Sequence, residues 1–285
     1  MMHKTEEPEV VSRLEADKRE PAFGMGMALL NKLPLVRRLY GKLFAQRRLP
    51  NRELIVSWDD QRILIRNPRH SLIGREVLLN GIWEPEVTNF ICPKLSHGMT
   101  VIDVGADIGY YTLLFARRVG EQGRVIAFEP IPAARERLED NVELNGYTNV
   151  TICDFALFSS KGQVILEGPL QLSRINPAKT KTENKDIHVE TRVFDECLLE
   201  LEVQRIDLVK IDVEGAELEV LRGMEESLTK YHPNLLVEVH PKHLSHFDYS
   251  PGDLLRFLDG RNYRVDPVDS TSLEFKGDNV TIYCT

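Results

Sequence analysis

The strongest constraint on the fold is the segment VIDVGADIG, which covers residues 101–109. An apolar, β-branched run ends at Gly105, and an amphipathic helical pattern begins directly after Gly109. A buried strand, a glycine turn and a helix in this order present a ligand site at the carboxyl end of the strand. The sequence therefore predicts an α/β domain with a ligand bound above this turn.

Strand and helix patterns alternate from Met99 onward. Apolar β-branched runs cover residues 100–104, 124–128, 150–155, 206–211 and 235–239, and helical patterns cover 110–119, 132–145 and 216–228. Such alternation predicts a doubly wound, mostly parallel sheet with helices on both faces. A helix over 251–258 and strands over 263–266 and 280–284 are expected to complete it.

One segment interrupts this alternation. Residues 162–166 and 188–193 have strand patterns and are predicted to pair with each other. The polar stretch between them, residues 168–186, is long enough to form a lid, although a solvated hairpin loop is the simpler interpretation.

The chain is expected to have three parts: residues 1–52, 53–97 and a catalytic domain over 98–285. Residues 1–20 are polar, whereas residues 21–52 lack acidic residues and place basic and apolar side chains at helical spacing, which predicts a tail and a basic amphipathic helix. Residues 53–70 predict a β-hairpin, and residues 85–95 predict a helix that leads into the catalytic domain.

The basic helix has two interpretations. It packs on its own catalytic domain, which we favour, or it lies on an anionic membrane surface. No apolar run reaches the roughly 18 residues that span a bilayer, and the N-terminus lacks a secretory signal pattern. The four widely spaced cysteines form no zinc or disulfide pattern. We therefore expect a cytoplasmic protein, alternatively peripheral at the inner membrane surface, and the net charge of −8 argues against a nucleic-acid partner.

The ligand above the turn is predicted from acidic residues. Glu129 follows Gly109 by about 20 residues, at the end of the second strand, where a carboxylate accepts hydrogen bonds from ribose hydroxyls. Dinucleotide loops have the spacing GxGxxG, but here the middle glycine is replaced by Asp107, which would repel a pyrophosphate. Asp103 and Asp107 suit a cationic ligand without phosphate, such as S-adenosylmethionine.

Four further residues lie at the ends of the fourth and fifth strands. Asp212 and Glu214 follow the fourth strand, and Glu238 and His240 project to the same side of the fifth. We expect them to converge on an acceptor hydroxyl, with His240 as general base. Alternatively, Glu214 caps the following helix and Glu238 pairs with Lys210. A divalent metal at this cluster is conceivable but not favoured, so no metal ligand is assigned.

Five segments together resemble the FkbM family of methyltransferases. They are VIDVGADIGYYTLLFA (101–116), AFEPIP (127–132), LEDNVELNG (138–146), DLVKIDVEGAELEVLRGM (207–224) and LLVEVH (235–240). The resemblance implies a Rossmann-like sheet with an antiparallel last strand. It also implies S-adenosylmethionine-dependent methylation, mostly of hydroxyls on sugars, polyketides and other natural products.

The resemblance also implies residue roles. Asp103, Gly105 and Gly109 would hold the methionine end of the cofactor, with Ala106 and Asp107 in the same loop. Glu129 would bind the ribose, and Asp154 and Ala156 would border the adenine. Asp107 stands where Asn is the commoner residue in the family.

The acceptor would be a small molecule, a glycan or a lipid-linked compound, and the oligomeric state is not predicted. Two alternatives remain: an NAD-dependent oxidoreductase on a similar sheet, and a membrane-associated binding module without catalysis.

Overall fold

The computed structural model describes residues 9–11, 53–66, 71–167, 174–175, 187–268, 272–275 and 279–285. The predicted amphipathic helix over 21–52 and most of the polar stretch over 168–186 lie outside these residues. The chain divides into two compact units, residues 1–84 and 85–285, so the lead-in helix groups with the larger unit. No helix in the described segments has the length and apolar character needed to cross a membrane.

The smaller unit contains the predicted β-hairpin. Strands β2 (Leu54–Trp58) and β3 (Gln61–Ile65) pair antiparallel, and β1 (Glu9–Val11) adds to β2 in parallel within the stretch expected to be a tail. Asp59 and Asp60 both have positive φ, 46° and 55°, which is the backbone conformation that a tight two-residue hairpin requires. Helix α5 (Leu72–Asn80), which the sequence analysis missed, follows with Ser71 as its N-cap.

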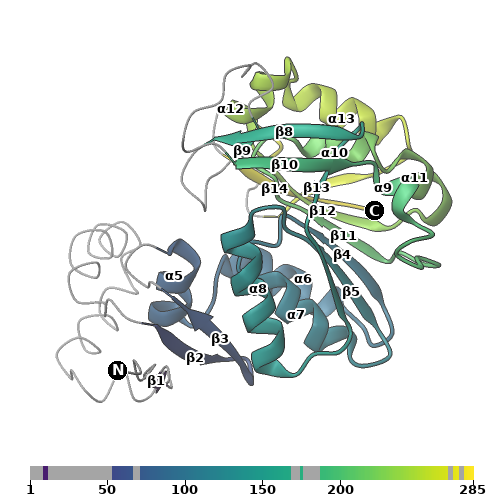
Figure 1. Cartoon of the computed structure of the whole chain (residues 1–285). Helices are drawn as coiled ribbons and strands as arrows, with labels where there is room; N and C mark the ends of the chain where they lie inside the picture. The colour runs from purple at the N-terminus through teal and green to yellow at the C-terminus, as the bar shows by residue number, and fades with distance from the viewer. Residues whose placement is uncertain are drawn as a thin grey trace. The chain divides into compact units, whose positions relative to one another are not determined.

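The larger unit is built on a seven-stranded sheet with the order β13-β14-β12-β11-β4-β5-β6 (Figure 1). Its strands are β4 (Thr100–Val104), β5 (Arg124–Phe128), β6 (Val150–Cys153), β11 (Leu208–Ile211), β12 (Asn234–Val239), β13 (Val265–Pro267) and β14 (Val280–Cys284). The strands from β12 to β6 are mutually parallel, whereas β14 is antiparallel to both β12 and β13. The predicted mostly parallel sheet with an antiparallel last strand is confirmed.

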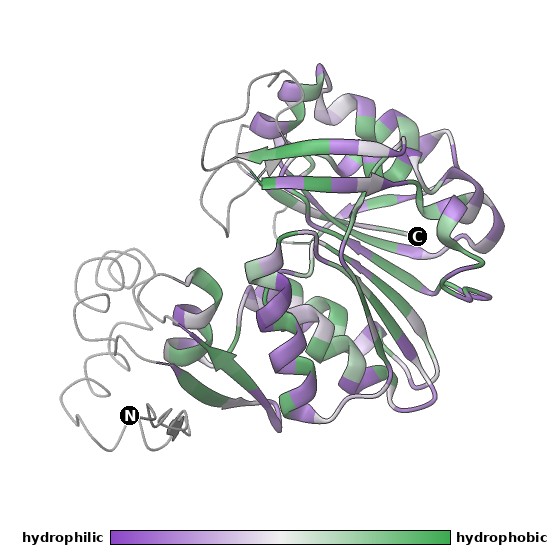
Figure 2. Cartoon of the chain, in the orientation of Figure 1, coloured by the Kyte–Doolittle hydropathy of each residue, from purple (hydrophilic) through white to green (hydrophobic). Residues whose placement is uncertain are grey.

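Helices cover both faces of this sheet (Figure 1). Helices α7 (Tyr110–Val119) and α8 (Pro132–Asn145) lie on one face, and α10 (Glu217–Arg222), α11 (Glu225–Tyr231) and α13 (Pro251–Asp259) on the other. The unit opens with α6 (Pro85–Ile91) and a 3-10 turn, η2 (Cys92–Lys94). Figure 2 shows mainly hydrophobic central strands and a largely hydrophilic α8, whose buried stripe consists of Ala134, Leu138, Asn141 and Val142.

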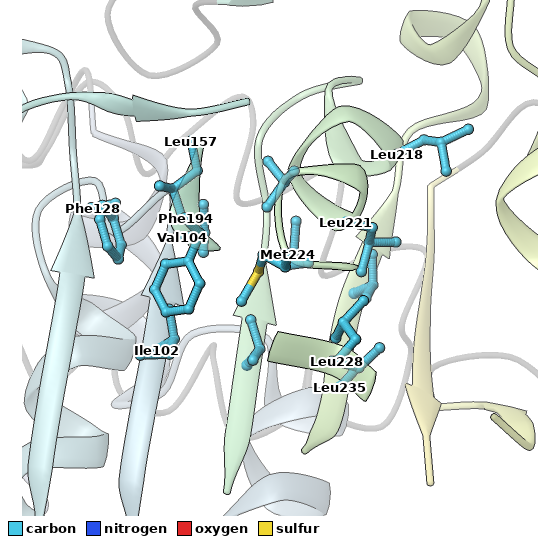
Figure 3. Packing of buried hydrophobic residues seen from close by; sticks show 14 of the residues in the cluster. Ile102, Val104, Phe128, Leu157, Phe194, Leu218, Leu221, Met224, Leu228 and Leu235 are labelled. Carbon is cyan, nitrogen blue, oxygen red and sulfur yellow. The ribbon is translucent and has the colours of Figure 1, made fainter. Parts of the chain in front are cut away.

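The main core lies between the sheet and the second helical layer (Figure 3). Ile102 and Val104 of β4 and Leu235 of β12 pack in one buried cluster with Leu218 of α10 and Leu228 of α11. Each fully buried side chain of this size contributes about 1.5–3 kcal/mol. This core holds the carboxyl ends of the parallel strands at one common edge.

A second, small sheet has the order β7-β10-β8-β9. It consists of β7 (Ala156–Leu157), β8 (Gly162–Glu167), β9 (Arg174–Ile175) and β10 (Ile187–Arg192). Strands β8 and β10 pair antiparallel, as predicted. Helix α9 (Phe194–Cys197) follows β10 and leads back to the main sheet.

The prediction of a single helix over 216–228 is wrong, because the segment is divided at Gly223 into α10 and α11. The Gly223 carbonyl accepts a hydrogen bond from Asp195 N (3.1 Å). The Asp195 carboxylate in turn accepts from Glu226 N (2.8 Å) and Ser227 N (3.0 Å), which caps the first turn of α11. A Cβ at Gly223 would overlap the carbonyl oxygen of Phe158. This close backbone approach requires glycine.

We therefore expect Gly223→Ala to lower the free energy of unfolding by about 1–3 kcal/mol or more, the usual cost of forcing atoms into a filled space. Chemical denaturation followed by circular dichroism measures this loss. Gly252→Ala on α13 is the matched control, because the nearest heavy atoms lie 3.5 Å from the added methyl. Equal stability of the two variants would contradict the close approach at Gly223.

Candidate active site

The glycine turn after β4 is held against two neighbouring strands. Gly105 N and Ala106 N both donate to Phe128 O at the end of β5, at 3.0 and 3.1 Å. Gly105 has a φ of +82°, and a Cβ there would overlap the carbonyl oxygen of Asp212, directly after β11. Glycine is required at this position for both reasons.

The second glycine starts α7. Gly109 has a φ of +92°, and a side chain there would overlap Leu138 of α8. The buried side chain of Asn141, also on α8, donates to Ile108 O at 2.8 Å and fixes the turn from behind. Asn141 was not predicted from the sequence. The feature that could have indicated it is a polar residue on the buried, otherwise apolar stripe of α8.

Asp103 lies inside the sheet directly below the turn and is fully buried. Its Oδ2 accepts from Thr112 Oγ1 of α7 at 2.6 Å, whereas Oδ1 has no hydrogen-bond partner among the described residues. Burial raises the pKa of Asp103 above its ordinary value, and the nearby Lys210 opposes this rise. A buried acceptor with unused capacity fits a cationic ligand group such as the ammonium of S-adenosylmethionine.

Glu129 follows β5 and is buried. Its two carboxylate oxygens accept from Ile131 N (2.8 Å) and Asp107 N (2.9 Å), and burial raises its pKa to about 8. Asp107 has a φ of +46°, a conformation that Asp and Asn tolerate better than most residues, and burial raises its pKa to about 6. The Asp107 backbone therefore orients Glu129, a contact that the sequence did not reveal.

The predicted adenine residues follow β6, the next strand along the edge. Asp154 is exposed and comes directly after Cys153, whose carbonyl accepts from Glu129 N at 3.0 Å. Ala156 is partly exposed in β7. The predicted cofactor residues thus lie at or just beyond the carboxyl ends of β4, β5 and β6, which are neighbours in the sheet.

The second group of predicted residues begins after β11. Asp212 Oδ2 contacts the buried Lys210 Nζ at 3.1 Å, so Lys210 forms an ion pair with Asp212. Burial alone would raise the pKa of Asp212, but the positive charges of Lys210 and His240 outweigh it and hold this pKa below its ordinary value. The remaining oxygen, Oδ1, lies 3.9 Å from His240 Nε2.

His240 is the centre of this group and is 2% exposed. It precedes the short helix α12 (Pro241–Leu244) as its N-cap residue. Its Nε2 lies 3.5 Å from Glu214 Oε2 and 3.6 Å from Glu238 Oε1. The structure therefore brings together all four residues that the sequence predicted for the acceptor. Glu214 also contacts His243 Nδ1 at 3.0 Å, and the N-cap residue of α10 is Ala216.

Glu217 orients His240. Nδ1 of His240 donates to Glu217 Oε1 at 2.6 Å, and the same oxygen accepts from Gly215 N at 2.8 Å. Burial by itself would lower the pKa of His240, but the hydrogen bond and the negative charge of Glu217 raise this pKa to about 10. Such a ring is protonated near neutral pH, which weighs against our expectation that it acts as general base.

The sequence analysis missed Glu217 because it stands in an amphipathic helix, where an acid in the first turn is ordinary. Its complete burial depends on the fold, so only the KIDVEGAE segment that contains it gave a signal. The two groups of the site meet where Gly105 approaches the carbonyl of Asp212. A cofactor pocket above β4 and β5 would therefore lie beside a cluster of acids and a histidine.

Comparison with known proteins identifies the domain. Residues 103–265, more than half of the chain, match the model of the methyltransferase FkbM domain. The chain is 31% identical over 157 residues to the hexuronic acid methyltransferase AglP of Haloferax volcanii, covering 55% of this chain and 62% of that protein. It is 25% identical over 146 residues to the 2-O-methyltransferase NoeI of Sinorhizobium fredii, covering 46% and 59%.

Among solved structures, the chain resembles methyltransferase FkbM from Methylobacillus flagellatus, with a TM-score of 0.48 and 17% identity, over 75% of this chain and 52% of that one. The chain spans less than two thirds of the length of the curated relatives named above. The domain match favours S-adenosylmethionine over a nicotinamide dinucleotide as the cofactor. The chain belongs to the FkbM family of S-adenosylmethionine-dependent methyltransferases.

Proposed function

We propose that this chain methylates a hydroxyl group on a sugar, a glycolipid or another natural product. The observation that carries the proposal is the convergence of Asp212, Glu214, Glu238 and His240 beside the glycine turn. Two relatives support a sugar acceptor, since their names specify a hexuronic acid and a 2-O position.

The cofactor would lie across the ends of β4, β5 and β6. Asp103 Oδ1 would accept from the ammonium of the methionine end, and Gly105, Ala106, Asp107 and Gly109 would leave room for it. Glu129 would accept from the ribose hydroxyls, while Asp154 and Ala156 would border the adenine. When bound, S-adenosylmethionine supplies an electrophilic methyl carbon on its sulfonium.

The chain's own residues would prepare the acceptor. A sugar hydroxyl barely ionises near pH 7, so a neighbouring group that takes its proton accelerates the reaction. The carboxylates of Asp212 and Glu238 lie on the Nε2 side of His240, and Glu238 would accept this proton, since the pKa of Asp212 is held below its ordinary value. His240, held by Glu217, would orient the acceptor oxygen between them. Alignment of the acceptor with the methyl carbon supplies much of the remaining rate enhancement.

The proposed cofactor site predicts that cofactor affinity depends on pH. Because burial raises the pKa of Glu129 to about 8, the unliganded protein keeps this carboxyl protonated below that pH. Ribose hydroxyls donate more strongly to the ionised carboxylate. The affinity for S-adenosylhomocysteine, measured by calorimetry, should therefore rise from pH 6 to 8 and then level off.

Glu129→Gln should flatten this pH profile, and Glu129→Ala should weaken binding by about 1.5–3 kcal/mol, the range for hydrogen bonds to a charged group. An unchanged pH profile in Glu129→Gln would show that another group titrates. Unchanged affinity in both variants would remove Glu129 from the ribose site.

The proposed acceptor site predicts which product forms and which residues methyl transfer requires. The chain, given S-adenosylmethionine with a labelled methyl group and a panel of hexoses and hexuronic acids, should form a methyl ether that survives mild base. Asp212→Asn, Glu238→Gln and His240→Ala should each lower kcat by about 10²–10⁴-fold, because each removes a group that contacts the acceptor. Their affinity for S-adenosylhomocysteine should change little.

His97→Ala is the matched control, since His97 is exposed and precedes β4 at the opposite edge of the sheet. Label that mild base releases would identify a methyl ester and overturn the hydroxyl acceptor. Full activity in all three cluster variants would overturn their proposed roles.

A further inference from the structure

The histidine at the centre of the acceptor cluster is oriented as metal-binding histidines are. Nδ1 of His240 donates to the carboxylate of Glu217, which is completely buried and also accepts from Gly215 N. A carboxylate on one ring nitrogen fixes the ring so that the other nitrogen faces a metal ion. The other nitrogen here, Nε2, points into a group of carboxylate oxygens.

The distances around Nε2 are too long for ordinary hydrogen bonds. Asp212 Oδ1 lies 3.9 Å and Glu238 Oε1 3.6 Å from Nε2, whereas N–H···O bonds span about 2.7–3.2 Å. Two ligands that are each about 2.1 Å from one cation lie about 3.0–3.5 Å apart. The ligand atoms of Asp212, Glu238 and His240 are all within 4.8 Å of one another, so small side-chain rotations bring them to a shared cation.

Each of the two carboxylates is also held from outside the cluster. Lys210 Nζ contacts Oδ2 of Asp212, which leaves Oδ1 toward the ring. Asn279 Nδ2 donates to Glu238 Oε1 at 3.0 Å. Glu217 accepts from Nδ1 of His240, so Asp212, Glu238 and His240 each have a supporting contact. Such support is typical of ligands that are preorganised around a metal.

The local charge also favours a cation. Asp212, Glu214 and Glu238 bring three carboxylates to within 3.9 Å of one ring nitrogen. Glu217 adds a fourth on the other side of the ring, and Lys210 is the lysine in contact with Asp212. Two oxygens and one imidazole nitrogen are a donor set that suits Mn²⁺ and related divalent ions.

We propose that Asp212 Oδ1, Glu238 Oε1 and His240 Nε2 bind a divalent cation, which would displace the Nε2 proton of His240 to solvent, with Glu217 as the positioning residue of His240. This departs from our sequence-based interpretation, which did not favour a metal at this cluster. The role of the cation rests on the proposed function: it would stabilise the negative charge that builds on the acceptor oxygen. The site itself is independent of that function.

Electron paramagnetic resonance tests the site directly, because Mn²⁺ loses its free-ion signal on binding. We expect one Mn²⁺ per chain, and we expect Asp212→Asn, Glu238→Gln and His240→Ala each to weaken binding at least tenfold. Glu217→Gln should weaken it by about 10–100-fold, the usual effect of removing a supporting carboxylate. Binding of S-adenosylhomocysteine checks that each variant is folded.

Glu121→Gln is the control carboxylate, since Glu121 is exposed in the turn before β5. Failure of the wild-type chain to bind Mn²⁺, or equal binding in the three ligand variants, would overturn the site. Methyl transfer measured on the same samples separates the two proposals. Transfer without bound Mn²⁺ would overturn only the proposed role of the cation, and bound Mn²⁺ without transfer to any hydroxyl would overturn only the proposed function.

Discussion

The crossing of three backbone segments at Gly105 determines how the rest of the site is arranged. Gly105 N and Ala106 N donate to the carbonyl at the end of β5, while Asp212 N, directly after β11, donates to Val104 O at 3.0 Å. The Cα of Gly105 lies against the Asp212 carbonyl so closely that no side chain fits between them. One small residue therefore sets the distance between the proposed cofactor loop and the proposed acceptor cluster.

This arrangement depends on the parallel order of the strands. Because β12, β11, β4, β5 and β6 run in the same direction, their carboxyl ends share one edge, and the polar residues that follow them are neighbours. The antiparallel strands β14 and β13 extend the sheet beyond β12 and bury its outer side. The apolar core between strands and helices keeps this edge rigid enough to hold buried charges in place.

The buried charges at the edge are costly for stability. An ionisable group removed from water needs a partner, and losing one partner of a buried pair costs about 3–5 kcal/mol. Asp103, Lys210, Glu217 and His240 are all buried, and hydrogen bonds or ion pairs join them to neighbouring groups. A set of such groups at one edge is typical of a functional site, because apolar residues of similar size would stabilise the fold as well or better.

Much of the fold could be predicted from the sequence, because glycine and proline mark the ends of strongly periodic segments. Helices α7 and α8 and strands β4, β5 and β14 have the predicted bounds. The convergence of Asp212, Glu214, Glu238 and His240 could also be predicted, since strand direction alone brings them to one edge. The hydrogen bond from His240 to Glu217 could not, because it joins residues 23 positions apart through a tertiary contact. The break at Gly223 depends in the same way on the Phe158 carbonyl from a distant segment.

The most direct test of this account is a crystal structure of the chain with S-adenosylhomocysteine. The account predicts that the ribose hydroxyls contact the Glu129 carboxylate, the amino group contacts Asp103, and the sulfur faces the side on which Asp212, Glu238 and His240 converge. A sulfur atom directed away from that cluster, with another group between them, would contradict the claim that one sheet edge serves both cofactor and acceptor.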